Sequence, residues 1–184
     1  MTKTSILNID YRKPIPNNLS VIYLGMGCFW GAERKFWDVD GVFSTAVGYA
    51  GGYSENPNYE DVCSGDTGHA EIVRVVYDQR INNLEVILSV FWESHDPTQY
   101  NRQGNDIGSQ YRSIILTENE NELPIINQTK QKYQKNLTAQ SKGVLKTEIK
   151  ILSNFFLAED YHQKYLHKNP NGYCGLKGLN IKYF

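Results

Sequence analysis

The chain has 184 residues, of which 40% are hydrophobic and 21% are charged, and its formal net charge at pH 7 is -1. A chain of this length buries roughly 70% of the surface that its unfolded form exposes, so it folds without disulfide staples. Because positive and negative charges balance, the composition does not favour a nucleic acid or a membrane surface as a partner, and small or peptidic ligands fit it better.

The N-terminal arm, residues 1–19, is irregular and marked by prolines, and it has no apolar core of the length found in signal peptides. No stretch approaches the roughly 18 uncharged apolar residues that a membrane span needs. The three cysteines, Cys28, Cys63 and Cys174, are an odd number at wide spacing, which argues against a secreted disulfide framework. We therefore expect one cytoplasmic domain over residues 1–184 and, by default, a monomer.

The sequence VIYLGMG at 21–27 predicts a short buried strand that ends at glycine, and CFWGAERKFWDV at 28–39 predicts a helix. Cys28 then lies at the N-terminal end of the helix, where unpaired backbone N–H groups and the helix dipole favour an anion. Such a position lowers the pKa of a thiol and makes it a nucleophile. Phe29 and Trp30 are expected to wall an apolar pocket beside the sulfur. The alternative is a small buried cysteine at a strand–helix turn.

The segments 42–50 and 69–78 predict two further strands, and the segment 51–68 between them, rich in glycine, asparagine, proline and serine, predicts a long functional loop. By the period of two, Glu71 shares an apolar face of the second strand with two valines. Partial burial raises the pKa of a carboxyl group, which makes Glu71 a candidate proton donor near neutral pH. A glutamate that reaches solvent from a strand end is an equally open interpretation.

The second half of the chain predicts a similar mixture of helices and strands. The expected elements are an amphipathic helix over 82–96, an irregular polar loop over 96–112, a strand over 113–117, a polar helix over 121–140, an edge strand over 147–152, a helix over 155–168, and a glycine-punctuated tail without regular structure over 169–184. Together the segments predict the α/β (α+β) class.

Three residues in the loops, Tyr59, Asp106 and Tyr111, have side chains suited to hydrogen bonding around a polarised oxygen. Taken singly, each is better explained as a loop residue that caps its own turn. A metal site is not expected, because the spacing of zinc ligands is absent from the four histidines: His69, His95, His162 and His167.

Six motifs in order along the chain resemble those of the A-type peptide methionine sulfoxide reductases: GCFWGAE, GYAGG, NPNYEDVCSGDTGHAE, FWESHDPTQYNRQGNDIGSQYRS, AEDYHQKYL and NPNGYCG. The resemblance implies a single α/β domain around a mixed β-sheet flanked by helices, with a ferredoxin-like core, long irregular loops and a C-terminal tail. It also implies an enzyme that reduces the S epimer of methionine sulfoxide, in proteins and peptides and as the free amino acid, to repair oxidative damage.

The resemblance further implies a role for individual residues. Cys28 of GCFWG is then the nucleophile, and Glu71 of GHAE is the acid. The sulfoxide oxygen is hydrogen-bonded by Tyr59 of NPNYE and Tyr111 of QYRS. The implied substrate-binding residues are Phe29 and Trp30 at the methyl group, His69, and Asp106 of GNDIG. Asp106 also holds the water network and is therefore an implied catalytic residue, together with Cys28, Glu71 and the two tyrosines.

The tail, residues 169–184, is expected to be flexible and carries the implied resolving cysteine, Cys174 of GYCG, which converts a sulfenic acid on Cys28 to a disulfide. No cysteine follows Cys174, so we expect a two-cysteine relay in which thioredoxin reduces the Cys28–Cys174 disulfide directly. Cys63 is expected to be a structural thiol, with substitution for Cys174 as the alternative. Thioredoxin is thus the expected external reductant, and no bound cofactor is expected.

The residues leave two other functions open. In a cysteine hydrolase, His69 or His95 would act as the base beside Cys28. In a binding module without catalysis, Phe29, Trp30 and the loop tyrosines would form an aromatic cage for a peptide methionine. A histidine beside the thiol favours the hydrolase, whereas the reductase needs only an acid there.

Overall fold

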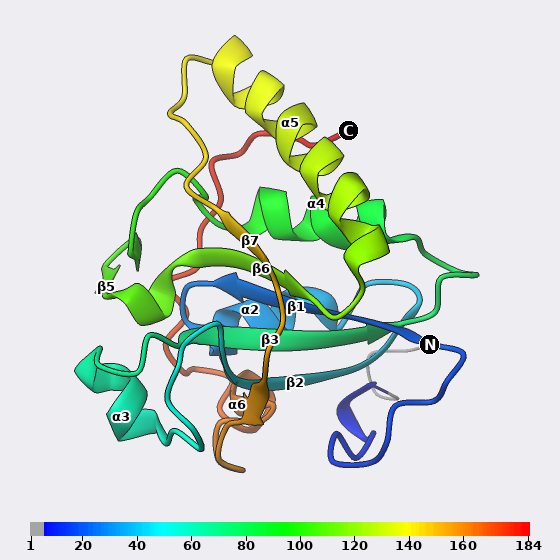
Figure 1. The fold of residues 1–184 in the computed structure, drawn as a ribbon, viewed down its shortest axis with the longest axis vertical. Coiled ribbons are helices and arrows are strands. Elements are labelled where there is room, and N and C mark those ends of the chain that lie inside the picture. Colours follow the sequence, from blue (N-terminus) through cyan, green and yellow to red (C-terminus); the bar gives the residue numbers. More distant parts are fainter. Residues whose placement is uncertain (1–5) are drawn as a thin grey trace.

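A mixed sheet of six strands forms the centre of the molecule in the computed structural model, which describes residues 6–184 (Figure 1). Residues 1–5 of the predicted arm lie outside the described part. The strands follow the order β7-β6-β1-β3-β2-β8 across the sheet. Their bounds are β1 Ser20–Met26, β2 Val42–Ala50, β3 Ala70–Tyr77, β6 Ser113–Thr117, β7 Glu148–Ile151 and β8 Phe155–Leu157.

The sheet contains the ferredoxin-like core that the motifs implied. In chain order, β1, helix α2 (Phe29–Phe36) and β2 are followed by β3, helix α4 (Leu84–Ser94) and β6. These four strands lie in the order β6-β1-β3-β2, and neighbouring strands are antiparallel. Each helix therefore connects two strands that are separated by a third, which is the split β-α-β arrangement of that fold. Strand β7 pairs parallel to β6 and makes the whole sheet mixed, as predicted.

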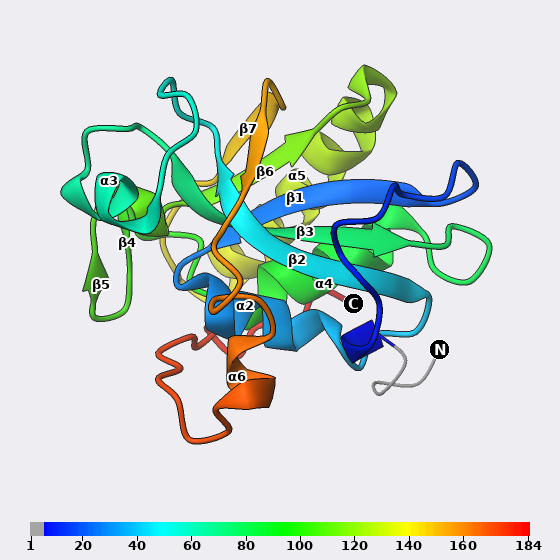
Figure 2. The ribbon, with the colours of Figure 1, turned by 90° about the horizontal axis from the view of Figure 1, so that it is seen from below.

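Helices α2 and α4 cover one face of the sheet (Figure 2), and α5 (Leu123–Ala139) packs against α4. Helix α4 is amphipathic, as predicted, and it begins where the Asn83 side chain accepts the Val86 N–H at 3.0 Å. Val73 and Val75 of β3 lie in the core beneath the helices. Because side chains alternate along a strand, Glu71 shares their face. The sheet thus directs a carboxyl group toward α2.

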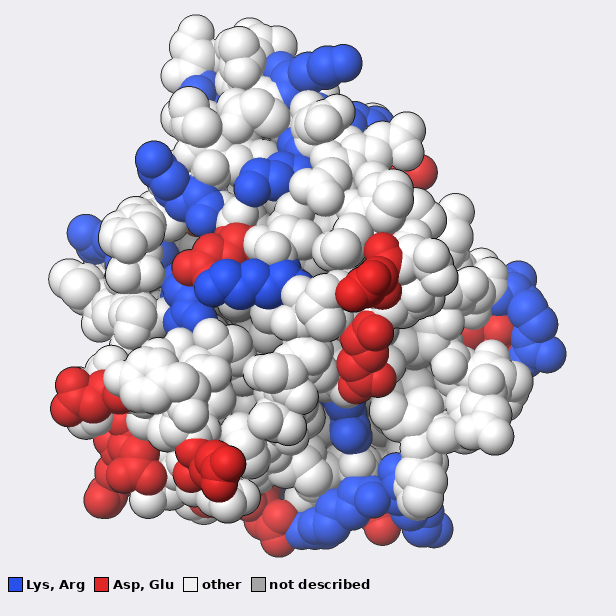
Figure 3. All heavy atoms as spheres, viewed as in Figure 1, with Lys and Arg blue, Asp and Glu red and all other residues white. Residues whose placement is uncertain are grey.

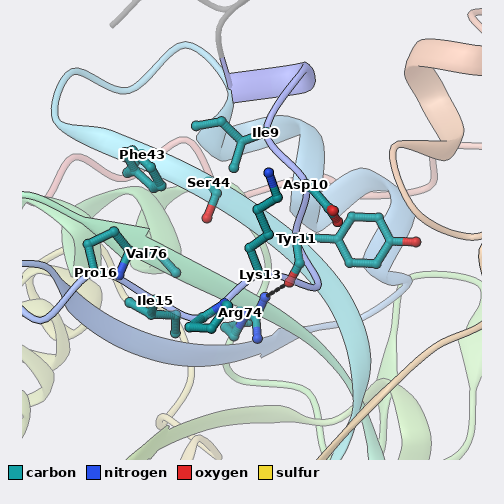
Figure 4. A pocket seen from close by; sticks show the side chains of 11 residues that line it. Ile9, Asp10, Tyr11, Lys13, Ile15, Pro16, Phe43, Ser44, Arg74 and Val76 are labelled. Carbon is teal, nitrogen blue, oxygen red and sulfur yellow. Dashed lines mark hydrogen bonds between the residues drawn. The ribbon is translucent and has the colours of Figure 1, made fainter.

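The opposite face of the sheet is covered by irregular chain. The segment from β7 to β8 crosses it from one edge to the other (Figure 1), and Leu152 and Phe155 pack there on a second apolar cluster. Figure 4 shows the N-terminal arm on β2 and β3, where it encloses a pocket of about 170 Å³. Beside this pocket, Arg74 Nη2 donates to the Tyr11 carbonyl oxygen at 2.6 Å. The arm is therefore tied to the sheet.

Charged side chains of both signs share the face shown in Figure 3, with basic groups over α5 at the top. None of the helices in residues 6–184 has the length and apolar composition of a membrane span. The same part of the chain contains no cluster of three or more His, Cys, Asp or Glu side chains arranged to hold a metal ion.

The predicted loop over 51–68 contains a helix, α3 (Tyr59–Ser64), so the prediction is wrong there. A capping box begins this helix: Asn58 Oδ1 accepts the Asp61 N–H at 2.9 Å, and Asp61 Oδ2 accepts the Asn58 N–H at 3.1 Å. Tyr59 is the first residue of this helix, and the helix therefore fixes its position. The polar loop over 96–112 likewise contains short elements, namely β4 (Arg102–Gln103), β5 (Asp106–Ile107) and a 3-10 turn (Ser109–Tyr111).

The predicted helix over 155–168 is wrong for most of its length. Residues 155–157 instead form β8 at the edge of β2, and only Tyr165–Lys168 are helical, as α6. The Gln163 side chain explains the difference, because it accepts the Val47 N–H at 2.9 Å and donates to the Val47 carbonyl oxygen at 2.8 Å. Pairing with this edge of β2 outweighs the local helix propensity.

A buried ion pair holds the same segment against α2. Lys164 Nζ lies 2.8 Å from Glu33 Oε1, and the Lys164 N–H donates to Glu33 Oε2 at 2.9 Å. Thr45 Oγ1 also donates to Glu33 Oε1, at 2.9 Å. Both charged residues are buried, so each charge depends on the other for its stabilisation.

Replacement of Lys164 by methionine is expected to lower the free energy of unfolding by about 3 kcal/mol, because the Glu33 carboxylate is left buried without its partner. Urea unfolding followed by circular dichroism measures this change. The double variant with Glu33→Gln and Lys164→Met is the control and should regain most of the loss. A Lys164→Met protein as stable as the parent would contradict the role given to the ion pair.

Candidate active site

The turn between β1 and α2 fixes the position of Cys28. Gly27 has a φ of 96°, and a Cβ there would lie 2.6 Å from the Gln103 side chain, so the turn requires glycine. Gln103 is held by the backbone of Asp96, whose N–H it accepts and whose carbonyl oxygen it binds, both at 3.0 Å. Cys28 follows as the N-terminal capping residue of α2, as predicted, and its side chain is partly exposed.

The carboxyl group of Glu71 contacts the same turn. The Phe29 N–H donates to Glu71 Oε2 at 2.8 Å, and Glu71 is only 2% exposed, which confirms the burial predicted from the strand pattern. Burial raises the pKa of Glu71 to about 8, although the Phe29 N–H opposes this shift, and the charge of Asp106 adds to it. At pH 7 the carboxyl group is therefore mostly protonated.

The predicted lowering of the Cys28 pKa is wrong. Burial raises the pKa of the Cys28 thiol well above its usual range, and the charge of Glu71 raises it further. The backbone N–H groups of Trp30 and Gly31 lower the pKa, as expected at a helix N-terminus, but their effect is smaller than that of burial. The resting sulfur is therefore a protonated thiol beside a protonated carboxyl group.

Phe29 and Trp30 form an aromatic wall with residues from the other end of the chain. Trp30 Nε1 donates to His162 Nδ1 at 2.9 Å, and the Trp30 ring stacks on Tyr165 with 3.8 Å between ring centroids. The His162 ring also lies 5.1 Å from the Phe29 ring and 4.7 Å from the Tyr59 ring. The sequence pattern indicated no role for His162, which was named only among the histidines that lack the spacing of zinc ligands. Its place in the AEDYHQKYL motif was the available signal.

The hydroxyl groups of Tyr59 and Tyr111 share the electrostatic environment of Glu71. Burial raises the pKa of both tyrosines, and the charge of Glu71 contributes to each shift. Both phenols are therefore neutral at pH 7 and able to donate hydrogen bonds. The Tyr59 hydroxyl group also contacts the thiol of Cys63, which lies four residues later on α3 and is exposed.

Asp106, on β5, influences the same group of residues through its charge. Its charge raises the pKa of Cys28, Glu71 and Tyr111. The Tyr173 hydroxyl group donates to Asp106 Oδ1 at 3.1 Å and so brings the C-terminal tail to the site. The structure thus brings together the residues that the sequence proposed as catalytic: Cys28, Tyr59, Glu71, Asp106 and Tyr111.

Arg112 holds the loops around the site and was missed by sequence reasoning. Its guanidinium group donates to the carbonyl oxygens of Ser109 at 2.9 Å, Gly68 at 3.0 Å and Gly51 at 3.3 Å. Arg112 Nε also lies 3.4 Å from Glu148 Oε1, and this ion pair balances the charge of the guanidinium group. No local pattern indicates these contacts, because their partners lie on separate segments of the chain.

His69 and His95 have both ring nitrogens occupied by groups other than Cys28. His69 Nδ1 accepts the Gly52 N–H at 3.1 Å, and its Nε2 donates to the Ser54 carbonyl oxygen at 2.8 Å. The His95 nitrogens bind the Phe91 carbonyl oxygen at 2.7 Å and the Ser113 hydroxyl group at 2.8 Å. Burial lowers the pKa of His95 to about 4. Neither ring is placed as the base of a cysteine hydrolase.

Cys174 lies over the first turn of α2. A Cβ at Gly31 would be 3.0 Å from Cys174 Sγ, and Arg34 Nη2 donates to this sulfur at 3.0 Å. Cys28, Cys63 and Cys174 are all free thiols in this structure. The implied nucleophile and the implied resolving cysteine therefore lie at the start of the same helix while both are reduced.

Comparison with known proteins finds relatives over nearly the whole chain. The family described as peptide methionine sulfoxide reductase matches residues 20–182. Peptide methionine sulfoxide reductase MsrA of Photobacterium profundum is 58% identical over 167 residues, which are 90% of this chain and 79% of that protein. The structure of methionine sulfoxide reductase A of Corynebacterium diphtheriae is 43% identical, with a TM-score of 0.85 over 92% of this chain and 82% of that one.

A second similar structure is Mxr1 from Saccharomyces cerevisiae in reduced form, which is 34% identical with a TM-score of 0.80 over 88% of this chain and 92% of that one. The family match over residues 20–182 includes the segments that carry the thiol, the acid and the aromatic wall. The chain belongs to the peptide methionine sulfoxide reductases of the A type.

Proposed function

We propose that this enzyme reduces the S epimer of methionine sulfoxide with Cys28 as the nucleophile and Glu71 as the acid. Membership of the family establishes the reaction class, methionine sulfoxide reduction. The proposed roles of Cys28 and Glu71 are supported by one contact: the buried, mostly protonated carboxyl group of Glu71 is hydrogen-bonded to the helix turn that bears the thiol. A carboxylic acid in this place favours a reductase over a hydrolase.

A sulfoxide has an electrophilic sulfur and a basic oxygen, so its reduction needs a nucleophile at the sulfur and a proton donor at the oxygen. The Cys28 sulfur attacks the sulfoxide sulfur while Glu71 gives its proton to the oxygen. The oxygen then passes to Cys28, which becomes a sulfenic acid, and methionine leaves. The thiol proton of Cys28 replaces the proton that Glu71 gave, so the net step consumes no proton.

Tyr59 and Tyr111 donate further hydrogen bonds to the oxygen as charge develops on it. Phe29 and Trp30 accept the ε-methyl group, and burial of that group contributes affinity. Since the oxygen, the methyl group and the rest of the side chain are held at different places, one epimer presents its sulfur to Cys28 and the other does not.

Asp106 and His69 complete the proposed substrate site in different ways. Asp106 binds the substrate through its carboxylate, and its contact with Tyr173 keeps the tail beside the site. His69 acts indirectly, because both of its ring nitrogens hold the backbone of residues 52 and 54. It therefore shapes the loop that borders the substrate.

Cys174 is the proposed resolving cysteine, and a thioredoxin is the proposed external reductant of the Cys28–Cys174 disulfide. Mxr1, the yeast relative, has been solved in complex with Trx2, which supports a thioredoxin as the partner. The proposed substrates are oxidised proteins, peptides and free methionine sulfoxide. We further propose a monomer in the cytoplasm, where reducing conditions keep the three free thiols reduced.

One turnover without an external reductant tests this proposal. Pre-reduced protein mixed with a peptide that carries racemic methionine sulfoxide should consume the S epimer only, because the site holds the oxygen and the methyl group at fixed places. Chromatography of the peptide shows which epimer is consumed. Intact mass and disulfide mapping of the protein should show a chain two hydrogen atoms lighter and linked through Cys28 and Cys174.

A Cys28→Ser variant is the control and should consume neither epimer. If the parent protein consumes neither epimer and keeps both thiols free, a binding module replaces the reductase.

The protonated carboxyl group of Glu71 should give an infrared carbonyl band that disappears as the pH rises through about 8. The direction follows from burial, which favours the neutral form of the acid. The same titration of Glu71→Gln, which cannot ionise, identifies the band by its absence. A Glu71 that is already ionised well below this pH would be unable to act as the proposed acid.

A further inference from the structure

The thiol of Cys174 is already docked on α2 while the protein is reduced. A Cβ at Gly31 would lie 3.0 Å from Cys174 Sγ and 3.1 Å from Leu176 Cβ, so this part of the tail packs directly on the first turn of the helix. Gly31 is three residues after Cys28. A Cβ at position 31 would require the resolving sulfur to move by a few tenths of an ångström, so glycine permits this close approach.

The tail is anchored on both sides of Cys174. Before it, the Tyr173 hydroxyl group donates to Asp106 Oδ1 at 3.1 Å. After it, the Tyr183 N–H donates to Glu93 Oε1 at 2.8 Å, and Tyr183 is 1% exposed. These anchors limit how far the thiol travels, but they do not themselves touch its sulfur.

Arg34 is the residue whose polar group contacts that sulfur. Arg34 Nη2 donates to Cys174 Sγ at 3.0 Å, and Arg34 follows Gly31 by three residues, on the same side of α2. The ion pairs found among residues 6–184 do not include Arg34. Within this part of the chain, the polar contact of the Arg34 guanidinium group is the one with the Cys174 sulfur.

We propose that Arg34 is a positioning residue for the resolving step: it holds Cys174 Sγ over the first turn of α2 and stabilises the sulfur anion that attacks Cys28. This inference rests on the proposed function, since it assumes a sulfenic acid on Cys28. A guanidinium group binds an anionic sulfur more strongly than a neutral one, so the contact strengthens when the attacking thiolate forms.

The step is balanced without any further reagent. The Cys174 thiolate attacks the Cys28 sulfur, an S–S bond forms, and the S–O bond of the sulfenic acid breaks. The oxygen leaves as hydroxide and takes up a proton to become water. The Cys28 sulfur is reduced and the Cys174 sulfur is oxidised, so the sulfenic acid is the oxidant.

Rapid-quench single turnover at saturating sulfoxide peptide, without thioredoxin, separates the two steps. The methionine formed reports the first step, and mass analysis after trapping with a dimedone-type reagent reports the lifetime of the sulfenic acid. In Arg34→Met, methionine formation should keep its rate, whereas disulfide formation should slow by about tenfold, as expected for loss of one charge-assisted hydrogen bond. Arg34→Lys, which keeps the charge, should lie between this variant and the parent protein.

Lys35→Met is the matched control, because Lys35 is also an exposed cation of α2 and should leave both rates unchanged. Equal disulfide rates in Arg34→Met and the parent protein, with normal methionine formation, would overturn the role of Arg34 and leave the proposed function standing. Absence of methionine from the parent protein would overturn the proposed function itself, and the role of Arg34 with it.

Discussion

The proposed chemistry depends on the hydrogen bond from the Phe29 N–H to the Glu71 carboxyl group. It joins the first residue of α2 to the second residue of β3, and it places an acid from the sheet beside the thiol that caps the helix. Groups held by a helix and a strand keep their geometry better than groups held by loops. The loops, pinned by Arg112 and His69, then supply the tyrosines and Asp106 around this fixed pair.

Glu33 on α2 and Glu71 beside α2 are both buried, and their surroundings give the two carboxyl groups different roles. Glu33 lies against the Lys164 ammonium group, and this ion pair serves the fold by joining a distant segment to the helix. Among residues 6–184, the groups that shift the pKa of Glu71 include no cation, and burial raises that pKa. An unpaired acid in such a site stays neutral rather than bear the cost of a buried charge. Similar burial explains why Cys28 rests as a thiol.

The parts of this site that depend on local pattern could be predicted from the sequence. The strand period placed Glu71 on an apolar face, and the strand–helix boundary placed Cys28 at a helix end. The direction of the Cys28 pKa shift could not be predicted, because burial and the charge of Glu71 outweigh the local effect of the helix N-terminus. The helix predicted over 155–168 failed because Gln163 pairs with the edge of β2. The same irregular path brings His162 to the aromatic wall, so the contacts of His162 could not be predicted from the sequence either.

In the proposed mechanism, a neutral Glu71 protonates the sulfoxide oxygen while Cys28 attacks the sulfur. The rate of methionine formation in the first turnover, measured across pH in the parent protein and in Glu71→Gln, tests it most directly. The parent rate should fall as the pH rises through about 8, where Glu71 loses its proton, and the variant should be slow without a change at that pH. A parent rate that stays level through this range, or a variant as fast as the parent, would contradict it.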